Sequence, residues 1–228
     1  MKEYLIIVAG GTGKRFNSKP PKQFLNIAGK PLLMHTISVF YNYSNQIEIF
    51  LVLPHEYFGF WENLCNENEF KINHRLVEGG SKRFYSVKNA LKFIPDESFV
   101  AIHDGVRPLV DQTTIKKCFT DVKKFRNAIP ASKINDSIRQ ISDDEKSIAI
   151  DRNKFRIIQT PQTFYSKKIK QAYLQEFAEC FTDDASVLES MGEEIHLVEG
   201  NPENIKVTKK SDLQFIETIL KERVSTGI

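Results

Sequence analysis

The sequence is poor in cysteine and lacks metal-ligand motifs and long apolar runs. Its three cysteines, Cys65, Cys118 and Cys180, are far apart and form no C-x-x-C pair, which is typical of reduced thiols in a cytosolic protein. The five histidines form neither an H-E-x-x-H motif nor a Cys/His cluster, so no zinc site is expected. The apolar run at the N-terminus is too short for a signal peptide, and no segment is long enough to span a bilayer. We therefore expect a cytoplasmic protein that does not enter a membrane.

An excess of one charge is also missing. The 32 Lys and Arg residues nearly balance the 29 Asp and Glu residues, which gives a net charge of +3 with histidine neutral. This mild basicity suits small anionic substrates and is too weak to indicate a nucleic acid as partner. The sequence shows no internal repeat, low-complexity stretch or linker. With 228 residues, 41% of them hydrophobic, we expect a single domain over residues 1–228 with a sizeable core.

The segment YLIIVAGGTGKRFNSKPPKQF, residues 4–24, carries the first functional prediction. Tyr4–Val8 is a continuous apolar run, as expected for a buried parallel strand. Three glycines follow it: Gly10, Gly11 and Gly13. Positions without side chains let backbone N–H groups approach a ligand closely. Three cations follow the glycines: Lys14, Arg15 and Lys22. A buried strand, a bare loop and clustered positive charge together predict a polyphosphate-binding loop.

Two common phosphate-binding motifs do not match this segment. A Walker A loop needs Gly-Lys-Ser/Thr, but Gly13 and Lys14 are followed by Arg15. It also needs a glycine five residues before Gly13, where this chain has Val8. A dinucleotide-binding motif needs its third glycine at the position of Phe16. A plain glycine turn beside a solvated basic surface therefore remains the alternative to a phosphate-binding loop.

Apolar strands alternate with amphipathic helices through the first half of the chain. Strands are predicted at Tyr4–Val8, Ile47–Leu53, Ile72–Val77, Phe99–His103 and Ala128–Ala131. Helices are predicted from Pro31 to Phe40 and at His55–Asn68, Arg83–Ile94 and Thr113–Phe125. This alternation predicts an α/β fold with a Rossmann-like, mostly parallel sheet and helices on both faces. Because ligands bind beyond the carboxyl ends of such strands, the turns that follow the strands should meet at one edge. These turns are the glycine loop, Gly79–Gly80 and Asp104–Arg107.

The pattern changes between residues 134 and 157. Ile138–Ile141 and Ser147–Ile150 flank the polar segment 142–146, which predicts a β-hairpin. Such a hairpin has exposed edges, and something must cover them. We expect an arm at about residues 134–157 that packs on a second copy of the protein and forms a homodimer. The alternative is a hairpin that folds back on its own domain.

Shorter elements are predicted in the rest of the chain. They are a helix at Ser166–Ala178, a helix capped around Thr182 that runs to Met191, strands at Ile195–Val198 and Ile205–Val207, and a C-terminal helix capped at Ser211–Asp212. No function follows from these elements by themselves.

Several motifs occur in order along the chain: AGGTGKRF with PKQF, VEGGSKRFYSV, IHDGVRP, NDSI, DRNKFRIIQTPQTF, TDDASVLESMG and NIKVT. This ordered set resembles the 2-C-methyl-D-erythritol 4-phosphate cytidylyltransferase family of the non-mevalonate isoprenoid pathway, over about residues 2–220. The resemblance implies a nucleotide-diphospho-sugar transferase type of fold and a homodimer with swapped β-arms. It also implies transfer of CMP from CTP to methylerythritol phosphate, with release of pyrophosphate and with Mg²⁺ as cofactor.

The resemblance further implies roles for individual residues. Three cations match the family's catalytic, phosphate-binding positions: Arg15, Lys22 and Lys206. The positions that match nucleotide binding are Ala9, Gly10, Gly11, Gly13, Gly80, Ser81, Arg83, Ser86 and Asp104. The positions that match acceptor binding are Asp104, Arg107, Asp136, Ser137, Arg152, Thr160 and Thr182. Because Asp136, Ser137, Arg152 and Thr160 lie in or beside the arm, each site should borrow them from the partner subunit. The metal's protein ligands stay open, as does the choice between substrate contact and helix capping for Thr182.

The implied reaction needs no general base. A phosphate monoester has a second pKa near ~6, so the attacking oxygen is already largely ionised at neutral pH. The site has to hold two anions together and stabilise the charge that spreads at phosphorus. The absence of a Ser/His/Asp arrangement is therefore compatible with this chemistry.

Four positions depart from the family pattern, and two other functions remain open. Ser137 stands where threonine is common, Ser81 and Lys82 replace a more acidic pair, and Gly105 replaces the usual alanine, which predicts a looser turn after Asp104. The nearest alternative is an enzyme that uses ribitol 5-phosphate as the acceptor. A second alternative is a catalytically idle nucleotide-binding scaffold, although a scaffold would have no use for the retained cations.

Overall fold

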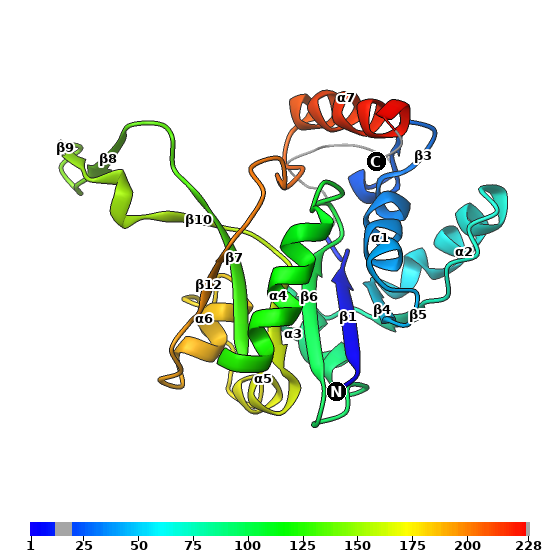
Figure 1. The fold of residues 1–228 in the computed structure, drawn as a ribbon, viewed down its shortest axis with the longest axis horizontal. Helices are drawn as coiled ribbons and strands as arrows, with labels where there is room; N and C mark the ends of the chain where they lie inside the picture. Colours follow the sequence, from blue (N-terminus) through cyan, green and yellow to red (C-terminus); the bar gives the residue numbers. More distant parts are fainter. Residues whose placement is uncertain (12–19, 227–228) are drawn as a thin grey trace.

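The centre of the protein is one mixed eight-stranded sheet (Figure 1). The structure is a computed structural model that describes residues 1–11 and 20–226. Four strands run parallel: β1 (Glu3–Val8), β4 (Glu48–Leu53), β5 (Arg75–Glu78) and β6 (Phe99–Asp104). The other strands are β7 (Asn127–Lys133), β10 (Arg156–Ile158), β11 (Gln162–Tyr165) and β12 (Leu197–Glu199). The order is β10-β7-β11-β6-β1-β4-β5, and β12 pairs in parallel with β7. Since only β10 and β11 oppose their neighbours, the predicted mostly parallel sheet is confirmed.

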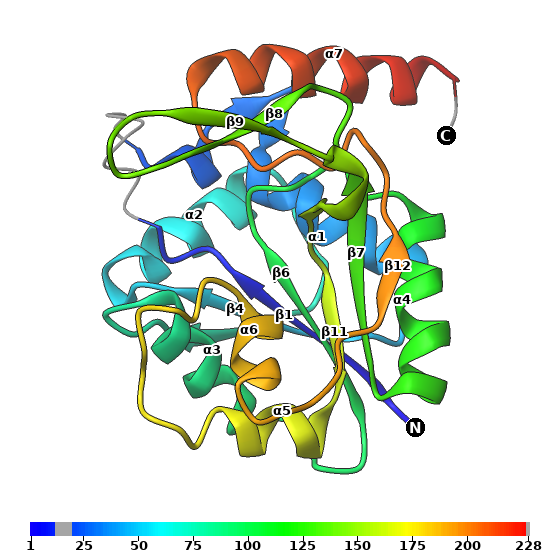
Figure 2. The same ribbon diagram turned by 90° about the vertical axis from the view of Figure 1, so that its left-hand side faces the viewer.

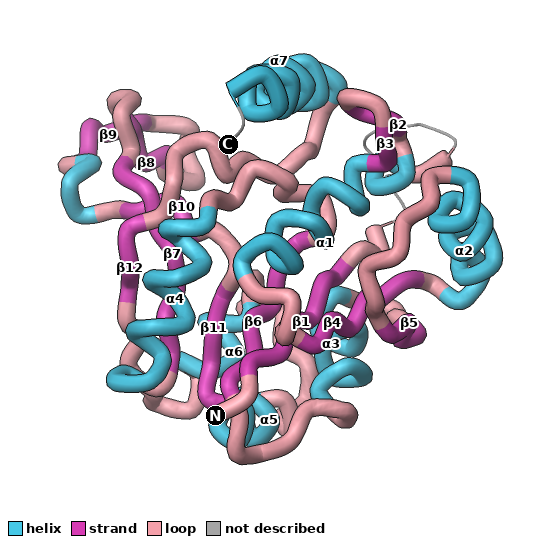
Figure 3. The backbone as a smooth tube through the Cα atoms, turned by 45° about the vertical axis from the view of Figure 1, so that its right-hand side comes forward, coloured by secondary structure: helices cyan, strands magenta, loops and turns pink. Residues whose placement is uncertain are grey.

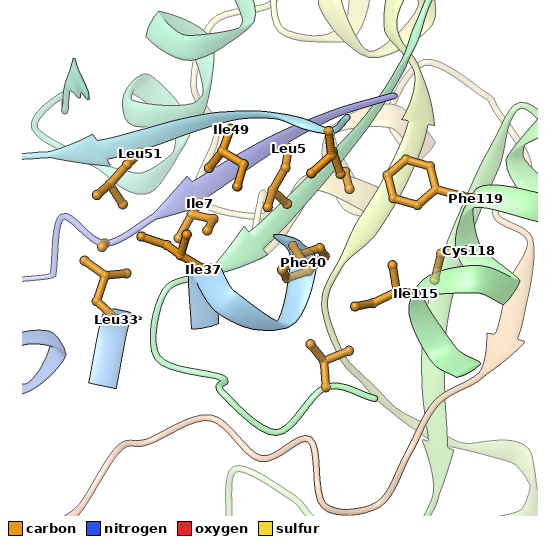
Figure 4. Packing of buried hydrophobic residues seen from close by; sticks show 14 of the residues in the cluster. Leu5, Ile7, Leu33, Ile37, Phe40, Ile49, Leu51, Ile115, Cys118 and Phe119 are labelled. Atoms are coloured by element: carbon orange, nitrogen blue, oxygen red, sulfur yellow. The ribbon is translucent and has the colours of Figure 1, made fainter. Parts of the chain in front are cut away.

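The apolar runs of the central strands supply both faces of the sheet. Leu5 and Ile7 of β1 point into one core cluster, while Tyr4 and Ile6 point into another, as the two-residue period of a strand requires. The first cluster packs under α1 (Leu32–Tyr43), α2 (Phe58–Glu67) and α4 (Gln112–Phe125). Figure 4 shows the contributions of α1 and α4 to it. The second packs under α3 (Arg83–Leu91), α5 (Ser166–Ala172) and α6 (Asp184–Glu189) (Figure 2). Both faces are therefore covered by helices, as predicted.

A third, smaller cluster lies beyond the end of β6. There α7 (Lys210–Thr226), whose place beyond the sheet Figure 3 shows, contributes Ile216 and Leu220. Both pack with Val106 and Val207. The short strands β2 (Asn26–Ile27) and β3 (Lys30–Pro31) pair with each other and add Ile27 to this cluster. Three short 3-10 helices complete the set of described elements: η1 (Lys22–Phe24), η2 (His55–Tyr57) and η3 (Arg152–Lys154). No helix in the described ranges has the length and apolarity needed to cross a bilayer.

The predicted β-hairpin is present and separate from the main sheet. β8 (Ile138–Ile141) pairs only with β9 (Ser147–Ile150), and both strands match the prediction residue for residue. Figure 1 shows the hairpin projecting from the side of the sheet where β7 ends and β10 begins. It does not fold back on the core, because Ile141 and Ile148 remain 63% and 62% exposed.

Several boundaries differ from the sequence-based prediction. Asp111, not Thr113, caps α4, because its carboxylate accepts the N–H of Thr114 at 2.6 Å. Likewise Asp183, not Thr182, caps α6 and forms a capping box with the residue at the third helical position. The helix predicted at Ser166–Ala178 ends at Ala172.

Two of the predicted strands also change. β5 begins at Arg75 instead of Ile72. The strand predicted at Ile205–Val207 is an extended segment joined to its neighbour by one backbone bond, from Val207 N–H to the Val106 carbonyl at 3.0 Å. A single bond of this kind does not make a ladder, so the alternating pattern there positions side chains without extending the sheet.

Candidate functional site

The turns that follow β1, β5 and β6 meet at one edge of the sheet and surround a cavity of about 380 Å³, here called the main cleft. Its lining includes these residues predicted to bind the nucleotide or its phosphates: Ala9, Gly10, Gly11, Lys22, Gly80, Ser81, Arg83, Ser86, Asp104 and Lys206. They come from segments up to about 200 residues apart in the sequence, and the parallel strands bring them together. Gly13 and Arg15 lie outside the described residues.

The second glycine turn is held by the hydroxyl of Ser86. This hydroxyl accepts the N–H of Gly80 at 3.0 Å and donates to the Lys82 carbonyl at 3.2 Å. A Cβ at Gly80 would overlap Tyr85, so the close approach of the turn to α3 requires glycine here. A Cβ at Gly10 would lie 3.8 Å from the Ser86 hydroxyl. Ser86 therefore holds the second glycine turn and lies beside the first.

The PKQF segment is bound to the first glycine turn and to the C-terminal part of the chain. The buried amide of Gln23 donates to the carbonyl of Ala9 at 2.8 Å and to that of Gly11 at 3.4 Å. Lys22 donates to the Val207 carbonyl at 2.5 Å and lines the cleft. The segment thus fixes one side of the cleft and places an ammonium group in it.

Asp104 ends β6 and lies among three cations. Its carboxylate is 3.1 Å from Lys206 and 3.1 Å from Arg107, both at Oδ2, and Oδ1 is 3.5 Å from Arg83 Nε. Burial by itself raises the pKa of this carboxyl, but the three cations outweigh burial and hold the pKa well below its usual range. Asp104 is therefore a fixed negative charge between otherwise cationic walls.

A buried hydrogen-bond chain supports the backbone at Asp104. The Asp104 N–H donates to the Thr160 hydroxyl at 3.2 Å, and that hydroxyl lies 2.9 Å from His103 Nδ1. His103 Nε2 lies 3.0 Å from the Arg107 carbonyl, which can only accept. Nε2 therefore carries the proton, and the Thr160 hydroxyl donates to Nδ1. This neutral tautomer agrees with the pKa of His103, which burial lowers to about 4.

A smaller cavity of about 220 Å³ adjoins the main cleft and is here called the side cavity. The two share Arg83, Asp104 and Lys206 in their walls. The side cavity also holds three of the predicted acceptor-binding residues: Arg107, Thr160 and Thr182. The expectation that Thr160 comes from the partner subunit is wrong, because its hydroxyl accepts the N–H of Asp104 in the same chain. Thr182 can face a ligand because Asp183 takes the capping role. Arg107 is a brace, since it contacts Asp104 and also donates to the Asn204 carbonyl at 2.7 Å.

The arm residues do not reach either cavity within one chain. Asp136 lines a separate cavity of about 640 Å³ at the base of the arm, together with Arg156 and Ile157. Arg152 donates to the carbonyl of Asn135 in the arm itself and is exposed. Neither cavity wall includes Ser137. Within the described part of one chain, these three predicted acceptor-binding residues therefore lie away from both cavities.

The turn after Asp104 is tighter than predicted. A Cβ at Gly105 would lie 2.8 Å from the Cβ of Ala9 and 3.1 Å from Leu33 Cδ1. The backbone of this turn thus packs directly against the first glycine loop. The prediction of a looser turn is wrong, because here glycine permits closer packing between the two turns.

The described residues contain no group of three or more His, Cys, Asp or Glu side chains that could hold a metal ion. Of the described residues that line the main cleft, Asp104 alone carries a carboxylate. Such a donor set does not form a protein cage for a cation. It fits a divalent ion that keeps water ligands and is bound mainly by phosphates, as Mg²⁺ commonly is.

Sequence reasoning missed the residues that support the site from behind. Asp184 is fully buried and accepts both terminal nitrogens of Arg83 at 2.7 Å, and the Tyr173 hydroxyl lies 2.5 Å from it. His103 and Gln23, which were also missed, are buried as well. All but Tyr173 lie inside the motifs that carry the family resemblance. Their roles depend on partners far away in sequence, which periodicity cannot reveal.

Comparison with known proteins gives a consistent result over nearly the whole chain. Residues 4–222 match the family described as IspD, 2-C-methyl-D-erythritol 4-phosphate cytidylyltransferase. A protein of that name from Bacteroides thetaiotaomicron is 44% identical over 220 residues, which cover 96% of this chain and 100% of the relative. One from Porphyromonas gingivalis is also 44% identical, over 96% of this chain and 98% of its own length.

Solved structures agree in fold. The 4-diphosphocytidyl-2C-methyl-D-erythritol synthase from Anaerococcus prevotii superposes with a TM-score of 0.82 at 28% identity and covers 96% of both chains. The bifunctional IspDF from Campylobacter jejuni gives a TM-score of 0.77 at 32% identity, over 94% of this chain and 54% of that one. The shared length, identity and architecture show that this chain belongs to the 2-C-methyl-D-erythritol 4-phosphate cytidylyltransferase family, IspD.

Proposed function

We propose that this protein transfers CMP from CTP to 2-C-methyl-D-erythritol 4-phosphate, forming 4-diphosphocytidyl-2-C-methyl-D-erythritol and pyrophosphate. The observation that supports this most strongly is the pairing of two cavities across a shared wall. The main cleft has two bare glycine turns and several cations, and the side cavity begins at the same Asp104 and Lys206. Two phosphorylated substrates held on either side of this wall would meet at it. Family membership identifies the two substrates.

The reaction is a substitution at the α-phosphorus of CTP. An oxygen of the acceptor phosphate forms a new bond to that phosphorus, and the bond to the oxygen that bridges to the β-phosphorus breaks. Pyrophosphate leaves with the electron pair of that bond. Because the acceptor phosphate is already ionised at neutral pH, no side chain has to remove a proton. This fits a site in which the nearest histidine, His103, is buried, neutral and bonded to the protein on both ring nitrogens.

The cations perform the electrostatic part of catalysis. Lys22 and Lys206 both line the main cleft, and we assign both, with Arg15, to the phosphates of CTP and to the charge that develops during transfer. The backbone N–H groups of the glycine turns complete the binding of the triphosphate and of the cytosine edge. We assign the ribose and acceptor hydroxyls to Asp104, whose fixed charge can accept hydrogen bonds from them.

A divalent cation, Mg²⁺ in our proposal, would be held by the CTP phosphates with Asp104 as its nearest protein carboxylate. When bound, it would neutralise phosphate charge and polarise the α-phosphoryl group. The remaining contributions come from the protein's own groups. They bind the two anions, align them, and keep the attacking and leaving oxygens in line.

We propose that the protein acts as a homodimer in which each arm completes the site of the partner subunit. Ile141 and Ile148 of the hairpin and Ile157 at its base are 63%, 62% and 52% exposed, which is a large apolar surface for an arm without a partner. The arm also carries Arg152, an acceptor-binding candidate that reaches neither cavity of its own chain. A second copy packed on the arm would account for both facts. The three cysteines are all free, in keeping with a reducing, cytoplasmic location.

The activity is tested by pyrophosphate release with CTP and Mg²⁺, with methylerythritol phosphate and ribitol 5-phosphate supplied separately. We expect release with the first acceptor only. Release with ribitol 5-phosphate alone would contradict the assigned acceptor but not the transfer chemistry. Binding of CTP without release in any mixture would support the idle scaffold instead.

The arm exchange is tested by co-expressing Lys22→Ala and Arg152→Ala and assaying at an acceptor concentration far below the KM of Arg152→Ala, so that neither variant has appreciable activity by itself. If arms cross, one of the two sites in a mixed dimer combines an intact cleft with an intact arm. Random pairing then restores about one quarter of wild-type activity. If each arm serves its own cleft, every site in the mixed dimer carries one defect and no activity returns. The second result would exclude the exchange.

A further inference from the structure

We infer that Asp184 is a positioning residue for the transfer site, acting through Arg83, and that Tyr173 holds Asp184 in the orientation this requires. The inference rests on the proposed cytidylyl transfer and extends it to residues outside both cavity walls. Neither Asp184 nor Tyr173 lines the main cleft or the side cavity.

The contact between Asp184 and Arg83 is bidentate. Arg83 Nη1 donates to Asp184 Oδ1 and Nη2 donates to Oδ2, each at 2.7 Å. This two-bond geometry fixes the plane of the guanidinium as well as its position. With the terminal edge of its guanidinium held by Asp184, Arg83 directs its Nε toward Asp104 Oδ1 at 3.5 Å. The orientation of Arg83 is thus set from behind the site.

Asp184 itself is anchored independently of Arg83. It is the first residue of α6, and Asp183 caps that helix. The side chain of Gln162, on β11, accepts the N–H of Ala185 at 2.8 Å and donates to Asp183 at 2.7 Å. The sheet therefore fixes the first turn of α6. The Tyr173 hydroxyl then donates to Asp184 Oδ1 at 2.5 Å, which fixes the rotation of the carboxylate.

Because Asp184 is buried, its charge depends on the partners that contact it. Asp184 has no exposed surface, and a carboxylate in that position is stable only with charged and hydrogen-bonding partners. Burial opposes the charge on Arg83, yet Asp184 and Asp104 raise its pKa well above the usual value. Arg83 thus remains a cation in the wall that separates the two cavities.

The pair affects function because Arg83 lies in the wall between the main cleft and the side cavity. Arg83 lines both the main cleft and the side cavity, as do Asp104 and Lys206. A guanidinium that turned away would release Oδ1 of Asp104 and change both cavities at once. Misplacement of such groups by about 1 Å can reduce a transfer rate about 100-fold. Asp184 therefore belongs to the alignment of the two substrates although it contacts neither.

The test uses Asp184→Asn, which keeps the shape and removes the charge, and Tyr173→Phe, which keeps the ring stacked on Phe84 and removes the hydroxyl. The matched control is Glu193→Gln. Glu193 is bonded through both oxygens to Lys168 at 2.6 Å and lines neither cavity. Each full-length variant is checked for folding by near-UV circular dichroism and is assayed below its melting range.

Two readouts separate positioning from a purely structural role. The first is calorimetric titration with CTP in the absence of acceptor, in which we expect Asp184→Asn to bind about tenfold more weakly and Tyr173→Phe about threefold more weakly. The second is kcat with both substrates saturating, which should fall about tenfold or more in Asp184→Asn. Glu193→Gln should match the wild type in both. The Tyr173→Phe comparison decides the matter even if Asp184→Asn does not fold.

A double-mutant cycle tests the route through Arg83. In an Arg83→Lys background the two-bond contact is already lost, so adding Asp184→Asn should cause little further loss. An undiminished tenfold loss in that background would overturn the route through Arg83, and folded variants with wild-type CTP affinity and kcat would overturn the positioning role. Failure of the wild type to release pyrophosphate would contradict the proposed function, whereas the CTP titration would still test Asp184.

Discussion

Acidification should destabilise this protein through His103, and the size of the effect follows from the structure. The His103 ring is completely buried and bonded as the neutral tautomer between Thr160 and the Arg107 carbonyl. Burial lowers its pKa from 6.5 to about 4, although the neighbouring Asp104 carboxylate acts in the opposite direction. Between these two pKa values the unfolded chain binds a proton that the folded chain does not.

The sign and the magnitude follow from this difference. The stability contributed by His103 is complete above pH 6.5 and is lost as the pH falls toward 4, because protonation favours the unfolded state. About pH 5 lies about 1.5 pH units below the pKa of histidine in the unfolded chain. Folding stability falls by about 1.4 kcal/mol for each of these units, so the loss at this pH is about 2 kcal/mol. His35, whose pKa burial also lowers to about 4, adds a similar loss of its own.

The variant His103→Gln isolates the contribution of His103 to the acid-induced loss of stability. Glutamine at this position can donate to the Arg107 carbonyl and accept from Thr160 without titrating. Urea unfolding, followed by far-UV circular dichroism at about pH 7 and about pH 5, should therefore show a smaller acid-induced loss in His103→Gln, by about 2 kcal/mol. His35 contributes equally in both proteins and cancels. Equal losses in wild type and variant would show that His103 is not a buried neutral histidine.

Other predictions concern the cavities and the turns beside them. Lys22→Ala should mainly lower kcat and Arg152→Ala should mainly raise KM for the acceptor, in initial-rate measurements with each substrate varied; the reverse pattern would contradict both assignments. Gly105→Ala should destabilise the protein by about 1–3 kcal/mol in urea unfolding, because the added methyl meets Ala9 and Leu33 at 2.8 and 3.1 Å. An unchanged midpoint would show that the turn can yield. Gly80→Ala should raise KM for CTP with little effect on acceptor KM, since the Cβ overlaps Tyr85 and forces the second glycine turn to move.

The fold was predictable where a strand is buried on both faces. The continuous apolar runs of β1, β4 and β6 indicate such strands directly, and the hairpin follows from two alternating segments around a polar turn. β11 was not predicted. It is a four-residue strand, QTFY, that becomes a strand because it fits between β6 and β7, where Thr163 pairs with both neighbours. The local sequence pattern cannot show that two other strands leave room for a strand between them.

The residues of the candidate site were likewise predictable only in part. Glycine turns and cations were found from the sequence, because bare backbone and positive charge are recognisable in a motif. The supporting groups were not, since Gln23, His103 and Asp184 look like ordinary polar residues until their partners are known. Asp184 accepts hydrogen bonds from a residue 101 positions earlier in the chain. Motif reading therefore finds the groups that face a ligand, and the structure is needed to find those that hold them in place.

Asp104 connects these two sets of groups, and its cations are not equivalent. Arg107 is 12% exposed and is bonded at both ends, to Asp104 and to the Asn204 carbonyl, so it has little freedom to move. Lys206 is 42% exposed and contacts the same carboxylate oxygen at 3.1 Å. The ammonium end of this pair is open to solvent although Asp104 is buried, so a triphosphate can compete with the carboxylate for Lys206. Once Lys206 moves, Arg107 and Arg83 still neutralise Asp104. The carboxylate can then stay fixed at the wall between the cavities while the mobile cation follows the phosphate, which is the division of roles that transfer between two anions requires.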